Sequence, residues 1–92
     1  MNEDKLREIE ARAAEATLGP WYRTEIRERE VWSGEGLIAR VHSRVGGWAD
    51  TLFMAAARSD IPALCAEVRR LQKVIERFQE HLDTSRDDVF YP

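Results

Sequence analysis

Residues 61–82 read IPALCAEVRRLQKVIERFQEHL, and their large apolar side chains recur at alternating steps of three and four. This spacing places the side chains along one seam of an α-helix, in the heptad pattern of a coiled coil. One short helix leaves such a seam in water, so we expect another helix to cover it. The predicted seam consists of Ile61, Leu64, Val68, Leu71, Ile75, Phe78 and Leu82.

The heptad register predicts a homo-oligomer. With Ile61 at position a, the a positions are mainly β-branched and the d positions carry leucine and phenylalanine, which favours a parallel two-stranded coil. The alternative is coverage inside one subunit by the N-terminal helix. The apolar stripe of that helix, Leu6, Ile9, Ala13 and Ala16, is less bulky than the seam. We therefore expect the seam to be divided between packing within the chain and packing between chains.

Composition restricts the class of protein. The chain has 92 residues, of which 34% are charged and 43% hydrophobic, and its formal net charge is −3. These values predict one folded domain spanning residues 1–92 and disfavour DNA binding, because a sequence-independent DNA binder neutralises phosphates with excess cations. There is no apolar run of membrane length and no signal peptide. Cys65 is the single cysteine, which excludes an intrachain disulfide and suggests the cytoplasm.

The N-terminal half predicts a helix followed by a small sheet. Residues 1–18 have helical periodicity, with Asn2 as the N-cap. The helix should end at Leu18-Gly19-Pro20, with Gly19 in a left-handed conformation. Residues 20–47 form the β segment, with strands expected over 21–27, 31–33 and 37–45 and a turn at Gly34-Glu35-Gly36. The sheet should be antiparallel, with two or three strands.

The C-terminal half predicts helices over residues 49–83. A short helix should span 49–58, and a second should begin at Ser59-Asp60-Ile61-Pro62, where a serine or aspartate can cap and proline fits the first turn. Residues 84–92 are expected to be a flexible tail. The fold class is therefore α+β: an N-terminal helix, a small antiparallel sheet, a short helix and a long amphipathic, heptad-patterned C-terminal helix.

Two segments resemble a family of small phage and prophage proteins described as Ead-like. They are residues 6–21, ending ATLGPW, and residues 50–71, containing FMAAARSDIPALCAEVRRL. The family pattern is a helix, a TPGPW turn, a variable β segment and an FIA(A/H)ARxDVPAL helix start. Leu18 replaces the first proline of the turn, and Met54 and Ile61 are conservative variants. The resemblance implies a phage accessory protein in the host bacterial cytoplasm and supplies no catalytic residues.

No catalytic or metal-binding motif is recognisable. The chain lacks the sequence signatures of nucleophilic hydrolases, zinc proteases and phosphate-binding loops. His42 and His81 have no acidic or sulfur partner at metal-ligand spacing, so we expect no metal. We accordingly expect no catalytic residue and no cofactor, and a protein that is not an enzyme.

An aromatic and basic set in the middle of the chain is the candidate ligand site. A planar base needs a π face on which to stack, and a phosphate needs guanidinium donors. Arg40, His42 and Arg44 alternate along one predicted strand, and Arg58 precedes a predicted helix N-terminus, which favours anions. Alternatively, the tryptophans build the core and the arginines lie on a solvated face. The candidate set is Trp21, Arg23, Trp32, Arg40, His42, Arg44, Trp48 and Arg58.

Three functions are compatible with these features. The first is a homo-oligomer that binds and sequesters a small nucleotide-like immune signal in phage counter-defence. The second is a protein inhibitor that occludes a host defence protein, as anti-CRISPR proteins do. The third is a helical oligomerisation adaptor without a ligand. The partners expected are therefore further copies of the chain and either a nucleotide or a host protein, but no membrane.

Overall fold

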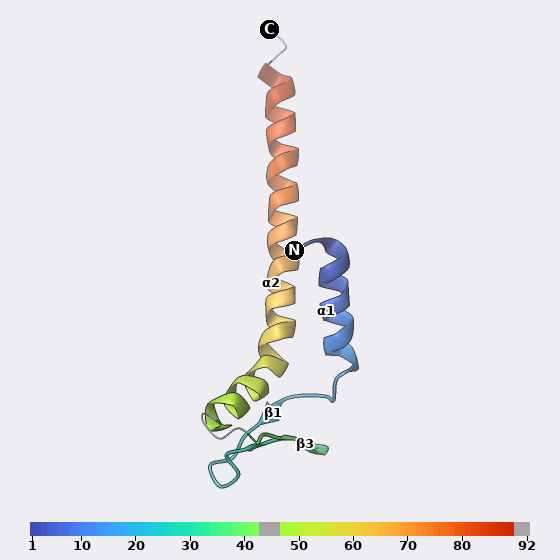
Figure 1. Ribbon diagram of the computed structural model, residues 1–92. Coiled ribbons are helices and arrows are strands. Elements are labelled where there is room, and N and C mark those ends of the chain that lie inside the picture. The colour runs from blue at the N-terminus through green and yellow to red at the C-terminus, as the bar shows by residue number, and fades with distance from the viewer. Residues whose placement is uncertain (43–46, 90–92) are drawn as a thin grey trace.

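The protein is a small α+β head from which one long helix projects. The computed structural model describes residues 1–42 and 47–89, and side chains as far as Asp83. The chain measures 73 × 25 × 19 Å, and α2 runs along its longest dimension (Figure 1). The elements are α1 (Glu3–Glu15), β1 (Trp21–Tyr22), β2 (Glu30–Ser33), β3 (Gly36–Arg40) and α2 (Gly47–Val89). This α+β order confirms the predicted fold class.

Helix α1 begins at the predicted N-cap, but it does not end through the predicted left-handed glycine. The Asn2 side chain accepts a hydrogen bond from the backbone N of Lys5 at 2.8 Å, which caps the helix. At the other end Ala16 is extended, and the only described glycine with a positive φ is Gly36. The predicted left-handed conformation of Gly19 is therefore wrong. A β-carbon on Gly19 would instead lie 3.0 Å from Cγ of Arg58, so the glycine gives that side chain room.

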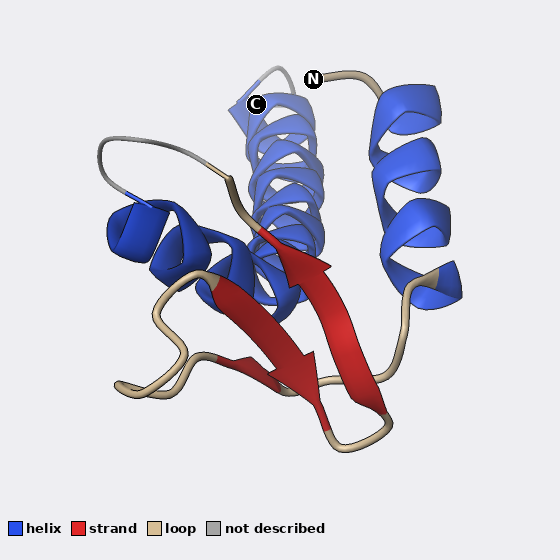
Figure 2. Cartoon of the chain, turned by 60° about the horizontal axis from the view of Figure 1, so that its bottom comes forward, coloured by secondary structure: helices blue, strands red, loops and turns tan. Residues whose placement is uncertain are grey.

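The sheet has three antiparallel strands in the order β1-β2-β3, within the predicted two or three. The first and third strands are shorter than predicted, and β2 begins one residue earlier, at Glu30. The first strand stops at Tyr22, because residues 25–29 form turns instead of continuing to residue 27. A two-residue turn joins β2 to β3, with Ser33 paired to Gly36. The third strand ends at Arg40, and residues 43–45 of the predicted strand lie outside the described residues. Figure 2 shows the sheet crossing the end of the molecule where α2 begins.

Helix α2 is one continuous element of 43 residues, and this corrects the prediction of two helices. Pro62 lies inside it, and no second N-terminus forms at Ser59 or Asp60. Figure 1 shows a bend where the green part of α2 meets the yellow part. Proline lacks the N–H that would bond the carbonyl four residues earlier, and its ring crowds that carbonyl, which bends a helix without ending it. The two predicted helices are therefore the two arms of one bent helix.

The core is small and lies between α1, β2 and the first half of α2. Leu6 and Val31 are its most deeply buried large apolar residues, and Ala55 and Cys65 are buried on α2. Helix α2 continues to Val89, beyond the predicted end near Asp83, so most of the predicted tail is helical. Residues 90–92, with the aromatic side chains Phe90 and Tyr91, lie outside the described residues.

Candidate functional site

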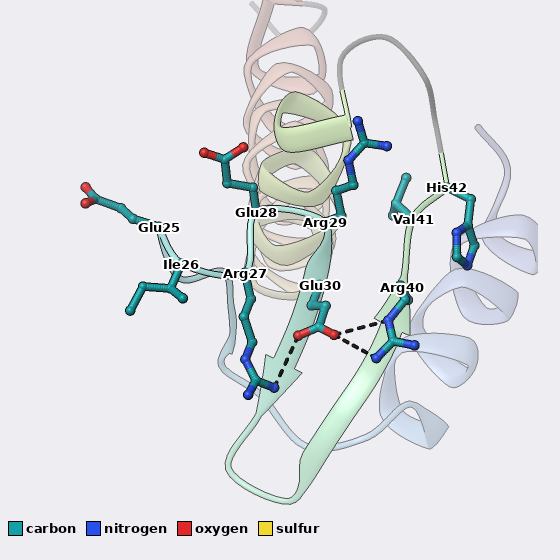
Figure 3. Close-up of a pocket in the computed structure, with 9 residues that line it drawn as sticks. All are labelled: Glu25, Ile26, Arg27, Glu28, Arg29, Glu30, Arg40, Val41 and His42. Atoms are coloured by element: carbon teal, nitrogen blue, oxygen red, sulfur yellow. Dashed lines mark hydrogen bonds and ion pairs between the residues drawn. The ribbon is translucent and has the colours of Figure 1, made fainter.

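A pocket of about 450 Å³ lies between the loop before β2 and the end of β3. Figure 3 shows that its charged side chains come from both segments. Arg40 and His42, two of the predicted ligand residues, lie on the β3 side. We call this the strand-loop pocket; it is lined by Glu25, Ile26, Arg27, Glu28, Arg29, Glu30, Arg40, Val41 and His42.

The carboxylate of Glu30 contacts three other side chains in and beside the strand-loop pocket. Arg40 donates to its Oε2 from Nε at 3.1 Å and from Nη2 at 2.9 Å, and Trp32 Nε1 donates to Oε1 at 3.1 Å. Arg27 lies 3.5 Å from Oε1, and its guanidinium carbon is 5.2 Å from the centroid of the Trp32 ring. The hydrogen bonds from Arg40 hold the pKa of Glu30 below its ordinary value. Glu30 is therefore a carboxylate that orients three neighbouring side chains.

Charge in the strand-loop pocket is balanced. Its lining includes three glutamates and three arginines, with His42 beside them. Arg40 is already engaged by Glu30, so an incoming phosphate would have to compete with a carboxylate. Strand β3 ends at Arg40, so Arg40 and His42 do not alternate along one strand as predicted. Arg44, the third member of that predicted row, lies outside the described residues. This pocket lacks the excess positive charge that a nucleotide site requires.

A second cavity, of about 390 Å³, lies between α1 and the bend of α2, with Trp21 at its edge. Two more of the predicted ligand residues, Trp21 and Arg58, line this cavity. The sequence did not predict that they would lie at a surface between two helices. We call it the helix groove; it is lined by Ile9, Arg12, Ala13, Ala16, Trp21, Met54, Ala57, Arg58, Ile61 and Pro62.

The carbonyl oxygen of Thr17 organises one end of the helix groove. Trp21 Nε1 donates to it at 3.0 Å and Arg58 Nε donates to it at 2.9 Å. These bonds tie the turn after α1 to the bend of α2, so both side chains have a structural role. The predicted helix N-terminus beside Arg58 does not form, because Arg58 lies inside the continuous helix α2.

The remaining predicted ligand residues lie elsewhere. Trp48 is in the first turn of α2 and is largely exposed. Trp32 supports the strand-loop pocket from β2. Arg23 is partly buried, and its Nε finds no hydrogen-bond partner among the described residues. Among the described residues of the predicted set, two line each cavity and three line neither, so the set does not form one site.

The predicted seam is largely exposed. At the d positions, Leu64, Leu71 and Phe78 are 60%, 45% and 61% exposed. At the a positions, Val68 is partly buried and Ile61 is 38% exposed where α1 lies close, whereas Ile75 and Leu82 are 55% and 44% exposed. The face of α2 directly under α1 carries Cys65, which is one residue after Leu64 and therefore about 100° around the helix.

An ion cluster holds α1 on α2. Arg69 donates from Nη1 to Glu3 at 2.6 Å and from Nη2 to Glu10 at 2.6 Å. Hydrogen bonds from Arg69 hold the pKa of both glutamates below the ordinary value. Sequence reasoning missed this cluster, although Glu3 and Glu10 are seven residues apart and share a helix face. Only the tertiary placement of α2 shows which arginine they bind.

Other kinds of site are not visible in the described part of the chain. Residues 1–42 and 47–83 contain no group of three or more metal-ligating side chains placed to hold an ion. No described helix combines the length and the apolar character needed to cross a bilayer.

Comparison with known proteins finds no matching family model, no significantly similar curated protein and no significantly similar solved structure.

Proposed function

We propose that this chain is a non-enzymatic binding protein that assembles as a homo-oligomer through α2 and sequesters a small nucleotide-like signal. The setting we propose is phage counter-defence in the cytoplasm of a host bacterium. That setting comes from the resemblance of residues 6–21 and 50–71 to small phage proteins. The assembly is supported by the structure of α2.

The exposed apolar seam of α2 is the observation that carries the proposal. Helix α1 lies on a neighbouring face, and its first residue, Glu3, pairs with Arg69. Further along α2, Phe78 and Leu82 are 61% and 44% exposed. Beyond α1, helix α2 projects alone (Figure 1). A single exposed leucine needs no explanation, but a continuous apolar row along a projecting helix is typical of an interaction surface.

The energy of this seam suits a reversible assembly. Full burial of a leucine, isoleucine or phenylalanine stabilises by about 1.5–3 kcal/mol, so a half-exposed side chain contributes roughly 1 kcal/mol when a partner covers it. Association costs about 4–15 kcal/mol of lost freedom. The two copies together must therefore bury the whole row to associate, and one defect in the row should separate them.

Leu71→Asp tests the assembly, because it would place an unpaired carboxylate in the middle of the seam. We expect wild-type protein to have a mass that is a multiple of 10.7 kDa in native mass spectrometry and the variant to be monomeric. Lys73→Asp is the matched control: it puts the same side chain at an exposed position on the far side of the same turn. A monomeric wild type, or dissociation of both variants alike, would contradict the proposal.

The same measurement tests sequestration when the protein is purified from its bacterial host. A nucleotide-sized adduct that denaturation releases unchanged is the expected result. An oligomer without such an adduct would favour the ligand-free adaptor.

A further inference from the structure

We propose that the helix groove, and not the strand-loop pocket, is the ligand site, and that it takes a small amphipathic anion with a flat apolar body and one anionic group. A nucleotide belongs to this class, and this choice of probe rests on the proposed function. The site itself lies within one chain, so its test does not depend on assembly.

The walls of the helix groove fit a flat apolar body. Ile9 and Ala13 contribute one wall from α1, and Met54, Ala57 and Ile61 contribute the other from α2. The alanines are small enough to leave a hollow where larger residues would fill it. The volume of about 390 Å³ falls within the range of small-molecule sites, which are mostly apolar with a few polar groups.

Charge distinguishes the helix groove from the strand-loop pocket. Arg12 and Arg58 line the helix groove, and no carboxylate is found among its described lining residues. The strand-loop pocket, by contrast, sets three glutamates against its arginines. An anion entering the helix groove would meet two guanidinium groups beside an apolar surface, where charge-assisted hydrogen bonds are stronger than in water.

Arg58 is oriented before a ligand arrives. Its Nε bond to the Thr17 carbonyl fixes the plane of the guanidinium, and a guanidinium carries five N–H donors, of which this bond uses one. Preorganised donors bind more tightly because less rotamer entropy is lost. Arg12 is exposed on α1 and can move toward the anion from the opposite wall.

Trp21 provides the signal for the test. Its indole N–H bonds the Thr17 carbonyl at the edge of the helix groove, whereas Trp32 and Trp48 lie elsewhere. The three indole N–H resonances can be followed separately by nuclear magnetic resonance, after assignment with Trp32→Phe and Trp48→Phe. We expect millimolar AMP to shift the Trp21 resonance in a saturable way. Adenosine lacks the anion and inorganic phosphate lacks the apolar body, so each should act far more weakly.

Arg12→Gln should weaken AMP binding about tenfold, because it removes one charge-assisted contact and leaves the Thr17 bonds intact. Arg40→Gln, in the strand-loop pocket, is the control and should leave the affinity for AMP unchanged. Ala13→Leu, which fills the hollow without changing charge, should also weaken binding. The site is overturned if AMP leaves the Trp21 resonance unmoved, if Arg12→Gln binds as wild type does, or if phosphate alone matches AMP. The same titrations are repeated in the Leu71→Asp variant, which is expected to be monomeric. Because the site lies within one chain, AMP should bind this variant too, so a failure of the site can be told apart from a failure of assembly.

Discussion

Thr51 is fully buried in the first turns of α2 and joins the helix to the loop before β2. Its hydroxyl oxygen lies within hydrogen-bond distance of the Glu28 carbonyl, and the Gly47 and Trp48 carbonyls are 3.1 Å and 2.9 Å away. A hydroxyl has one proton and can satisfy one acceptor at a time. The Gly47 and Trp48 carbonyls are close to Thr51 simply because they belong to the same helix turn. The Glu28 carbonyl belongs to the loop before β2, so its hydrogen bond with Thr51 fixes the loop that forms the strand-loop pocket.

Thr51→Val should destabilise the fold by about 1–2 kcal/mol, because a nearly isosteric side chain would leave the Glu28 carbonyl without its donor. Thr51→Ser keeps the hydroxyl and should lose less, through the missing methyl group alone. Urea unfolding followed by circular dichroism measures both. Equal losses for valine and serine would show that the methyl group, and not the hydroxyl, holds this turn.

Local signals predicted single residues well only where the partner is close in sequence. Asn2 caps α1 because the N-cap acts on a backbone N–H three residues away. The partners of Thr51 and Arg58 are 23 and 41 residues distant, so no spacing rule could identify them. The sequence predicted a helix N-terminus beside Arg58, and that N-terminus does not form. Arg58 instead donates to the Thr17 carbonyl and lines the helix groove.

At the scale of elements, α1 is attached to α2 by apolar packing and by charge. Leu6 is buried, and Arg69 makes a bidentate contact with Glu10 and donates from Nη1 to both carboxylate oxygens of Glu3. Beyond the other end of α1, Arg58 bonds the Thr17 carbonyl. Heptad periodicity predicted that α2 needs a covering helix, and the small side chains of α1 predicted incomplete cover. Which face of α2 is covered by α1 could not be predicted, because the Arg69 side chain and the two glutamates it binds are 59 and 66 residues apart in the sequence.

Arg69→Gln should loosen α1, because two glutamates would lose their cation. Cys65 lies buried under α1, so its thiol should become more reactive toward a thiol reagent at neutral pH when α1 detaches more often. Arg70→Gln is the matched control: Arg70 pairs with Glu67 three residues away on α2 itself, so its loss should leave Cys65 protected. Equal reactivity in the two variants would show that the Arg69 cluster does not anchor α1.

The docking of α1 should also depend on pH. Arg69 lowers the pKa of Glu3 and Glu10 from the ordinary value of 4.5. A lowered pKa stabilises the folded state fully above the unfolded value and loses that effect as the pH falls through the folded value. Stability should therefore decline below about pH 4.5, and Arg69→Gln should show a shallower decline in thermal unfolding between neutral pH and pH 3.

At the scale of the whole molecule, the proposed function assigns ligand binding to the head and assembly to the projecting arm of α2. The helix groove lies in the head, and the arm carries exposed apolar seam residues beyond α1 (Figure 1). The sequence predicted this arm from periodicity alone, since an apolar repeat without enough covering bulk implies a second chain. It could not predict the helix groove, because Arg12 and Met54 come together only when α1 folds back along α2.

The heptad register predicts that the two copies run in parallel, which places both heads at one end. In a parallel coil each a-position residue faces its own copy, whereas an antiparallel coil separates the two. Leu82→Cys, in a Cys65→Ala background, should therefore form an intermolecular disulfide under mild oxidation, visible as a dimer on a non-reducing gel. Arg77→Cys, exposed on the opposite side of α2, is the control and should cross-link slowly. If Leu82→Cys cross-links no faster than the control, the copies do not meet in parallel along this seam.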